Sequence, residues 1–437
     1  DKPVLYDRNK LTDPWKIISW NMMNDMVNTL AKALLELGVN PQDKIGQFSQ
    51  NKSENLIVDF ASFLLRGIVV PIYPTSSQAQ VEFIIADAGV KILFVGDQRQ
   101  YDFAVEILKT SDCLKKIIVF EKDVILSDSE HSLYFDDLVA LGIKSLKKDE
   151  LEQADAQATE QDMFCLLYTS GTTGNPKGVI LTYEMVNEAM RIHLMRLHQV
   201  KDNDVSIAFL PLTHVFERMW CYFLLHVGAS VYINHHPTEI QTTLKDVRPT
   251  LMCAVPRFWE KVYVGVKEVL SGYTPSKLAI VTWAVEVGKK HNIDHVRIGK
   301  KPDLFLSLSY KLAEKLVYSK LKTTLGLENA KALPVAGAKL SDEITRFFRS
   351  IGVPIVYGYG LTETTATVSC FEDEYEIGTV GTIMPSIQAK MGDENEILLK
   401  GKTITPGYYK NPEANRQAYT ADGWFRTGDA GEIRDNK

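Results

Sequence analysis

Cysteine is scarce in this sequence, and the positions of the cysteines argue against two kinds of site. The 437 residues include five cysteines, at positions 113, 165, 221, 253 and 370. Their number is odd and none belongs to a C-x-x-C pair, so neither a disulfide framework nor a zinc site is indicated. A reducing compartment fits this pattern, and we expect a cytoplasmic protein.

Concentrated positive charge and long apolar runs are also missing. The chain has a formal net charge of −6 and a pI near 5.9. It has no Lys/Arg run, which argues against nucleic acid as a partner. The longest apolar stretch, residues 219–233, is interrupted by His226 and Gly228 and is too short to span a bilayer. The first residues do not form a signal peptide. Peripheral membrane contact and homodimerisation stay open.

Two common nucleotide-binding loops are absent, but a different glycine-rich stretch is present. The Walker loop needs Gly directly before Lys, whereas Lys177 lies between Pro176 and Gly178, and no G-x-G-x-x-G occurs. Residues 166–179 read Leu-Leu-Tyr-Thr-Ser-Gly-Thr-Thr-Gly-Asn-Pro-Lys-Gly-Val. Glycines let backbone N–H groups approach an anion, while hydroxyls and an ammonium add donors. The residues concerned are Thr169, Ser170, Gly171, Thr172, Thr173, Gly174, Lys177 and Gly178.

The composition of this stretch predicts a polyphosphate-binding loop. The apolar run 164–168 predicts a buried strand before the loop, and the segment from Glu184 onward predicts a helix after it. A flexible surface loop is the alternative. It is disfavoured because short turns seldom combine so many glycines, hydroxyls and a lysine.

Strand-like and helical segments alternate along the chain, which predicts an α/β fold with two helix-covered, mainly parallel sheets. The expected helices are 20–37, 54–66, 78–88 and 217–226, and the expected strands are 44–48, 68–73, 91–95, 116–120, 206–212, 230–234 and 251–255. The charged stretch 144–162 predicts a linker or an exposed excursion. The region 273–326 is predicted to be helical, with apolar faces such as Leu308, Leu312, Leu316 and Tyr318 to Leu321. Core packing is favoured for these faces over a lipid or partner groove.

Beyond Cys370, short strands and turns predict a small antiparallel, barrel-like subdomain. The resulting domain boundaries are 1–160, 161–370 and 371–437.

Three further motifs carry candidate ligand-binding groups. Ala336-Gly337-Ala338 and Tyr357-Gly358-Tyr359-Gly360-Leu361-Thr362-Glu363-Thr364 each follow an apolar strand, where open α/β sheets bind ligands. Tyr359 can lie flat against a base, and Glu363 offers an oxygen to magnesium. Asp429, after a tight turn, can accept hydrogen bonds from ribose hydroxyls. Taken alone, Glu363 and Asp429 would more often be solvated or turn-stabilising carboxylates.

Together with Pro211-Leu-Thr-His-Val-Phe-Glu-Arg218, these motifs resemble the adenylate-forming superfamily of acyl-CoA synthetases, adenylation domains and luciferases. Within it, the sequence is most similar to long-chain fatty acyl-CoA synthetases, on the evidence of residues 214–220, Val255-Pro-Arg-Phe-Trp259 and the helical region. The resemblance covers nearly the whole chain.

The resemblance implies a role for each matching residue. Residues 169–177 would hold the β- and γ-phosphates of ATP, and Thr169 with Glu363 would hold Mg²⁺. The nucleotide would be bound by Gly337, Ala338, Tyr357, Gly358, Tyr359, Gly360, Thr362 and Asp429, with Thr362 at the α-phosphate. Lys177, His214, Thr362 and Glu363 would be catalytic. Phe216 and Trp220 would line an acyl tunnel, although a plain core Trp is an equally good interpretation.

The implied reaction forms acyl-AMP and pyrophosphate from a fatty acid and ATP, after which coenzyme A displaces AMP. Family members continue into a mobile C-terminal domain, so we expect this chain to be the N-terminal portion of the enzyme. Two alternatives remain. One is an amino-acid or aryl-acid adenylation domain, in which Glu217 would pair with an ammonium group. The other is a nucleotide- or acyl-binding module without catalysis.

Overall fold

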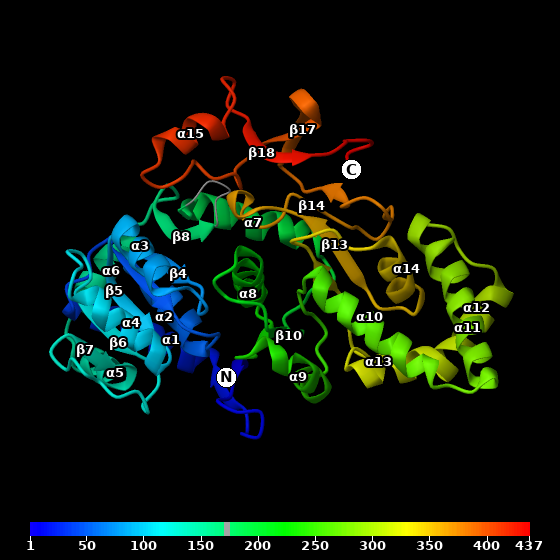
Figure 1. Cartoon of the computed structure of the whole chain (residues 1–437), viewed down its shortest axis with the longest axis horizontal. Helices are drawn as coiled ribbons and strands as arrows, with labels where there is room; N and C mark the ends of the chain where they lie inside the picture. The colour runs from blue at the N-terminus through cyan, green and yellow to red at the C-terminus, as the bar shows by residue number, and fades with distance from the viewer. Residues whose placement is uncertain (170–174) are drawn as a thin grey trace.

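The first α/β part is built on a seven-stranded sheet (Figure 1). The computed structural model describes residues 1–169 and 175–437. The strand order is β7-β6-β5-β3-β4-β8-β9, all parallel except the antiparallel β8–β9 pair. The strands are β3 Lys44–Phe48, β4 Ile68–Ile72, β5 Val90–Val95, β6 Lys116–Val119, β7 Ser132–Tyr134, β8 Met163–Thr169 and β9 Lys177–Thr182. Their nearly continuous apolar sequences suit strands buried on both faces.

Six helices accompany this sheet, and the predicted helices among them are confirmed. They are α1 Trp20–Glu36, α2 Ser53–Leu64, α3 Gln78–Ala88, α4 Gln98–Leu108, α5 Phe135–Lys144 and α6 Lys148–Ala156. The stretch 144–162 is not a linker, because α6 forms there and buries Leu151 against the core, but the other residues of α6 lie at the surface, in line with the alternative of an exposed excursion. The predicted boundary at residue 160 falls inside one sheet, since β8 pairs with β4.

A second α/β part contains two four-stranded sheets, with orders β10-β11-β1-β2 and β12-β13-β14-β15. The strands are β1 Pro3–Asp7, β2 Lys16–Ser19, β10 Val205–Ala208, β11 Ser230–Ile233, β12 Leu333–Val335, β13 Ile355–Tyr359, β14 Ser369–Cys370 and β15 Thr382–Ile383. The accompanying helices are α7 Tyr183–Arg196, α8 Val215–Val227, α9 Ile240–Val247, α10 Pro256–Ser271 and α14 Asp342–Ser350. The strand predicted at 251–255 is reduced to isolated bridges from Leu251 and Ala254.

The predicted helical region forms an insert at the outer end of the molecule (Figure 1). It comprises α11 Pro275–Gly288, the π-helix η2 Lys289–Ile293, the 3₁₀ turn η3 Val296–Ile298, α12 Leu304–Ala313, the π-helix η4 Glu314–Tyr318 and α13 Ser319–Leu325. The prediction that Leu308, Leu312 and Leu316 pack in the core is wrong, because all three are exposed. The opposite side of the same helix, with Val317 and Tyr318, is the buried one, so the core packing predicted for Tyr318 is confirmed.

The C-terminal part is a three-stranded antiparallel sheet, β16 Gln388–Met391, β17 Glu396–Lys400 and β18 Phe425–Ala430, with helix α15 Pro412–Ala418. Backbone bonds from Ile180 to Gly407 and from Tyr409 to Gly178 tie this part to β9. In the described part of the chain, no helix combines the length and apolar character needed to cross a membrane.

Candidate active site

The predicted phosphate loop joins the two strands of a β-hairpin. Thr169 at the end of β8 is the register partner of Lys177 at the start of β9. The predicted strand before the loop and the predicted helix after it are confirmed as β8 and α7, but the sequence analysis missed β9, which lies between the loop and α7. The alternating buried residues Val179 and Leu181 favour a strand there. Ser170, Gly171, Thr172, Thr173 and Gly174 lie outside the described residues.

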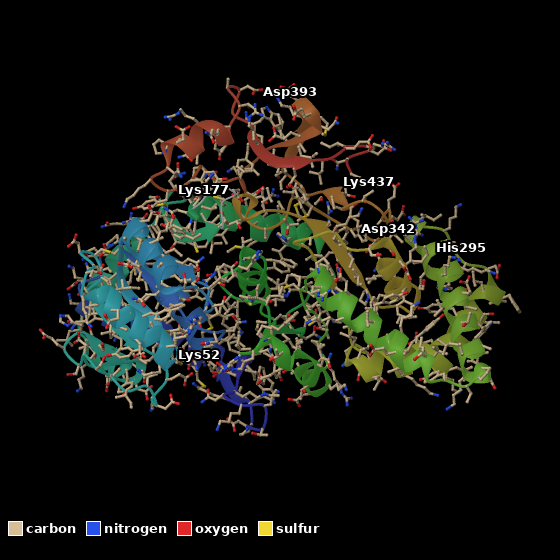
Figure 2. The ribbon with its side chains drawn as sticks, in the orientation of Figure 1. Lys52, Lys177, His295, Asp342, Asp393 and Lys437 are labelled. Atoms are coloured by element: carbon tan, nitrogen blue, oxygen red, sulfur yellow. The ribbon has the colours of Figure 1, made fainter. Side chains whose placement is uncertain are left out.

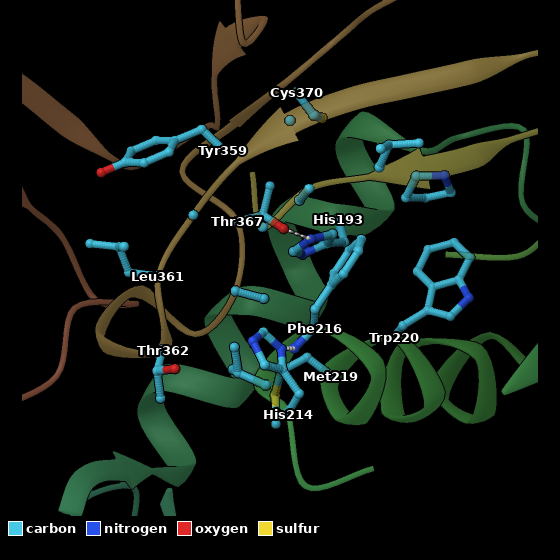
Figure 3. A pocket seen from close by; sticks show the side chains of 18 of the residues that line it. His193, His214, Phe216, Met219, Trp220, Tyr359, Leu361, Thr362, Thr367 and Cys370 are labelled. Carbon is cyan, nitrogen blue, oxygen red and sulfur yellow. Dashed lines mark hydrogen bonds between the residues drawn. The ribbon is translucent and has the colours of Figure 1, made fainter. Parts of the chain in front are cut away.

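A cavity of about 500 Å³ opens beside this hairpin, between the ends of β12 and β13 and the N-terminal part of α8. It brings together most of the predicted site residues that the structure describes. These are Thr169, His214, Phe216, Trp220, Gly337, Gly358, Tyr359, Gly360, Thr362 and Glu363. Figure 3 shows Tyr359, Leu361 and Thr362 at one end and Trp220 at the other, with His214, Phe216 and Met219 between them.

The polar end of the cavity places an aromatic ring next to a carboxylate. The Tyr359 hydroxyl donates a 2.6 Å hydrogen bond to Asp429. Burial, together with this carboxylate, raises the pKa of Tyr359, so the phenol stays neutral and remains a donor. Close packing demands glycine at position 360, where a Cβ would lie 1.4 Å from the Ala366 carbonyl oxygen. The backbone beside the ring is therefore held in place.

Ala338 and Tyr357 lie outside the lining of the cavity and hold the loop that follows β12. The Tyr357 hydroxyl donates to the Ala338 carbonyl at 3.1 Å and accepts from the Leu340 N–H at 3.2 Å. Neither Ala338 nor Tyr357 is among the described residues that line the cavity. Both bonds hold the loop after β12, in which Gly337 has a φ of 92° that favours glycine. The two residues thus fix the loop backbone.

Glu363 and Lys177 share a contact residue that sequence reasoning missed. The Tyr408 hydroxyl donates to Glu363 Oε1 at 2.9 Å, and Lys177 Nζ lies 5.4 Å from the centre of the Tyr408 ring. The pKa of Tyr408 is raised by burial and by the nearby Glu363 carboxylate. Figure 2 shows Lys177 where the hairpin meets the C-terminal part. Tyr408 belongs to the region beyond Cys370, in which the sequence predicted short strands and turns but no contact with the site.

His214 occupies the N-cap of α8, at the middle of the cavity. Its Nδ1 accepts a 3.2 Å hydrogen bond from the Phe216 N–H. The ring is exposed to the cavity, yet the surrounding protein desolvates it and lowers its pKa. A neutral imidazole that accepts at Nδ1 carries its proton on Nε2. His214 can therefore donate one hydrogen bond from Nε2.

The apolar end of the cavity comes from α7 and α8. Phe216, Met219, Trp220 and Phe223 line it. The Trp220 Nε1–H donates to Ser206 at 3.2 Å, which fixes the indole. Two further lining residues escaped the sequence analysis, His193 and Thr367, whose side chains bond each other at 3.0 Å. They come from segments 174 positions apart, and no local motif connects them.

Glu217 and Arg218 point away from the cavity. Glu217 is fully buried, accepts from the Leu210 N–H at 2.9 Å and contacts the thiols of Cys221 and Cys253. Burial raises its pKa to about 8. Arg218 pairs with buried Asp59. Among the described residues lining the cavity, Glu363 is the one carboxylate, so the expected partner for an amino-acid ammonium group is not in place.

A second cavity of about 500 Å³ meets the first one at Thr169, His214 and Thr362. Its polar lining residues include Tyr73, Thr75, Ser76 and Gln80, which follow β4, and Thr213, while Ile84, Leu167, Tyr168, Pro176 and Val215 complete the lining. Within residues 1–169 and 175–437, the buried Thr213 hydroxyl has no hydrogen-bond partner. Such a group suits a polar ligand in this cavity.

The sequence matches the family described as AMP-binding enzyme over residues 1–409. The chain belongs to the AMP-binding enzyme family. Among the curated relatives of this AMP-binding enzyme is the long-chain-fatty-acid–CoA ligase FadD15 of Mycobacterium bovis, 30% identical over 98% of this chain and 70% of the relative. The human long-chain-fatty-acid–CoA ligase ACSBG2 is 29% identical over 99% of this chain and 65% of the relative.

Solved structures confirm the fold of this AMP-binding enzyme. The N-terminal domain of FACL13 from Mycobacterium tuberculosis aligns with a TM-score of 0.68 and 20% identity, covering 99% of this chain and 93% of that one. The predicted α/β class with helix-covered, mainly parallel sheets is therefore confirmed. The family match includes each predicted site residue except Asp429, which lies beyond residue 409.

Proposed function

We propose that this AMP-binding enzyme activates a long-chain fatty acid for transfer to coenzyme A. The observation that carries the proposal is a single cavity with Tyr359 and Asp429 near one end, Phe216 and Trp220 towards the other, and His214 between them. A nucleotide suits the first end and an apolar chain suits the second. The names of the two curated relatives support the same substrate class.

In the proposed first step, a carboxylate oxygen of the fatty acid attacks the α-phosphorus of ATP. An oxygen–phosphorus bond forms, the bond to the β-phosphate breaks, and pyrophosphate leaves. His214 Nε2–H would orient the carboxylate, and Thr362 would donate to the α-phosphate. Lys177 and the loop that it closes would hold the outer phosphates, near the polar second cavity that contains Thr213.

In the second step, the sulfur of coenzyme A attacks the acyl carbon. The carbon–sulfur bond forms, the bond from the acyl carbon to AMP breaks, and the thiol proton is lost to solvent. Asp429 would hold AMP through its ribose, while Gly337 and Tyr359 would flank adenine. Tyr359 would keep the Asp429 carboxylate aligned through the 2.6 Å hydrogen bond that it donates to it.

The residues near the hairpin suit Mg²⁺. Glu363 uses one carboxylate oxygen for Tyr408, which leaves the other for a cation, and the Thr169 hydroxyl is a second oxygen donor. Mg²⁺ often takes only one or two protein oxygens and completes its shell with water and phosphate. When bound with ATP, the ion neutralises phosphate charge as the carboxylate approaches.

Pyrophosphate exchange into ATP by the full-length protein tests this function. Palmitate should support exchange, whereas phenylalanine and benzoate should not. Exchange driven by phenylalanine or benzoate would favour the adenylation-domain alternative. ATP binding without any exchange would favour a nucleotide-binding module.

A further inference from the structure

The helix that runs through α12, η4 and α13 has apolar side chains on two sides. On the inner side, Ala313, Val317 and Tyr318 are at most 5% exposed, and the Tyr318 hydroxyl bonds the Ala284 carbonyl of α11. The outer side consists of five residues that are 42–81% exposed, and we call it the outer face: Leu304, Phe305, Leu308, Leu312 and Leu316. A helix that is apolar all round is normally covered all round.

The outer face is presented on a fixed support. Tyr310 stacks on His291 of η2 with ring centres 4.0 Å apart, and its hydroxyl accepts from Asn292 at 3.0 Å. The adjacent helix α11 exposes Ile280 and Trp283 as well. Figure 1 places α11 and α12 at the outer end of the molecule, and Figure 2 labels His295 of the same insert far from Lys177. The outer face is therefore separate from the candidate active site.

Exposed lysines surround the outer face. Lys311 and Lys315 directly precede Leu312 and Leu316, and further lysines stand at the ends of the face, namely Lys300, Lys301 and Lys320. In the part of the chain that the structure describes, none of these five lysines forms an ion pair. Lys322, by contrast, pairs with Glu314 at 2.7 Å. Asp303 is exposed near one end, where it caps the helix through the Leu306 N–H.

The charge of the insert is opposite to that of the whole chain. Residues 273–322 contain ten Lys and Arg against four Asp and Glu, whereas the chain as a whole has a net charge of −6. An exposed apolar stripe edged with lysines is the pattern of helices that lie in the headgroup region of a membrane. Clustered lysines near such a helix are attracted to anionic lipids.

We propose that the outer face binds the surface of an anionic lipid bilayer, with the helix axis in the plane of the membrane. The leucines and Phe305 enter the boundary of the acyl chains, while Lys311 and Lys315 extend to the phosphates of the headgroups. A second copy of the chain fits less well, because docking two outer faces together would bring their lysines close to one another. The proposal rests on exposure and charge, and it does not depend on the substrate proposed above.

Co-sedimentation of the full chain with vesicles tests the proposal. Binding should be strong with vesicles that contain phosphatidylglycerol, weak with pure phosphatidylcholine, and reduced at high salt. The double variant Leu308→Glu/Leu312→Glu and the double variant Lys311→Glu/Lys315→Glu should each weaken binding by about tenfold or more. Melting curves should match the parent, since all four side chains are exposed.

A matched control is available at Leu146 on the first α/β part. Leu146 is 94% exposed and also stands beside lysines, but Lys147 pairs with Glu150 and Lys148 with Glu152. Leu146→Glu should therefore leave vesicle binding unchanged. Unchanged binding by both double variants, or equal binding to neutral vesicles, would overturn the proposal. So would a lipid-free dimer in sedimentation velocity that the Leu308→Glu/Leu312→Glu variant dissociates while vesicle binding persists.

Discussion

The two ends of the cavity are built by different means. At the polar end, side chains that follow strands are each fixed by a hydrogen bond, as Tyr359 is to Asp429 and Glu363 is to Tyr408. At the apolar end, Phe216, Met219 and Phe223 come from one helix and are held by packing, and Trp220 of the same helix adds one hydrogen bond to Ser206. Hydrogen bonds are directional and packing is not. Ligand binding at the polar end should therefore depend on single hydrogen-bonding atoms. Ligand binding at the apolar end should depend on the volume of the side chains.

The largest expected effect is at the polar end. Lys177→Ala or Glu363→Ala should lower the rate of ATP–pyrophosphate exchange by about 10²–10³-fold, since each removes a group aimed at developing charge. The melting temperature of Lys177→Ala should barely change, because substitutions at partly exposed positions alter stability by about 0.5 kcal/mol or less. Glu363→Ala also removes the hydrogen bond from Tyr408 and should melt somewhat lower while still folding. Lys402→Ala is the control, since Lys402 pairs with Glu184 and does not line the cavity. Cooperative unfolding of the variants would assign Lys177 and Glu363 a structural role instead.

A smaller effect is expected when one oxygen atom is removed. Tyr408→Phe keeps the ring beside Lys177 but deletes the hydroxyl that holds Glu363. A hydrogen bond to a charged group contributes about 1.5–3 kcal/mol, so exchange at limiting Mg²⁺ should fall by roughly 10- to 100-fold. High Mg²⁺ should partly restore it. Tyr409→Phe is the matched control, because Tyr409 has no bond to Glu363, and equal losses in both variants would contradict the assignment.

The smallest effect on ligand binding is expected at Glu217, on the buried side of α8. Its folded pKa of about 8 exceeds the ordinary value of 4.5, so the folded state retains a proton that the unfolded state has lost. The contribution of Glu217 to stability should thus fall as pH rises from about 4.5 to about 8. Glu217→Gln should remove that slope in denaturant melts and leave the affinity for AMP unchanged. A slope that persists in the variant would show that another group titrates.

The polar end could be predicted from sequence because its residues follow strands in short motifs. Thr169, Tyr359, Thr362 and Glu363 all line the cavity as expected: Thr169 ends β8 of the seven-stranded sheet, and the other three lie at or just after the end of β13 in a separate sheet. Asp429 does not line the cavity, and it contacts the polar end through the hydrogen bond that Tyr359 donates to it. The glycine-rich composition of residues 166–179, however, did not indicate that the phosphate loop connects the two antiparallel strands β8 and β9.

Other features depended on tertiary contacts that no local pattern reports. His193 meets Thr367 because α7 packs near the loop that leads into β14, and Tyr408 meets Glu363 across the junction with the C-terminal part. The exposed stripe of Leu308, Leu312 and Leu316 has the same periodicity as a buried stripe. Sequence periodicity shows which residues share one face of a helix, but it does not show whether that face is buried or exposed.

Binding of a series of non-hydrolysable acyl-adenylate analogues tests the division of the cavity most directly. Calorimetry would compare acetyl, octanoyl and palmitoyl analogues on the parent chain, Asp429→Ala and Trp220→Ala. The parent should gain roughly fourfold in affinity per buried CH₂, about 0.8 kcal/mol each, until the apolar end is full. Asp429→Ala should weaken all analogues by the same factor, whereas Trp220→Ala should change only the long ones. Equal affinities for all chain lengths, or a loss in Asp429→Ala that grows with chain length, would contradict this account.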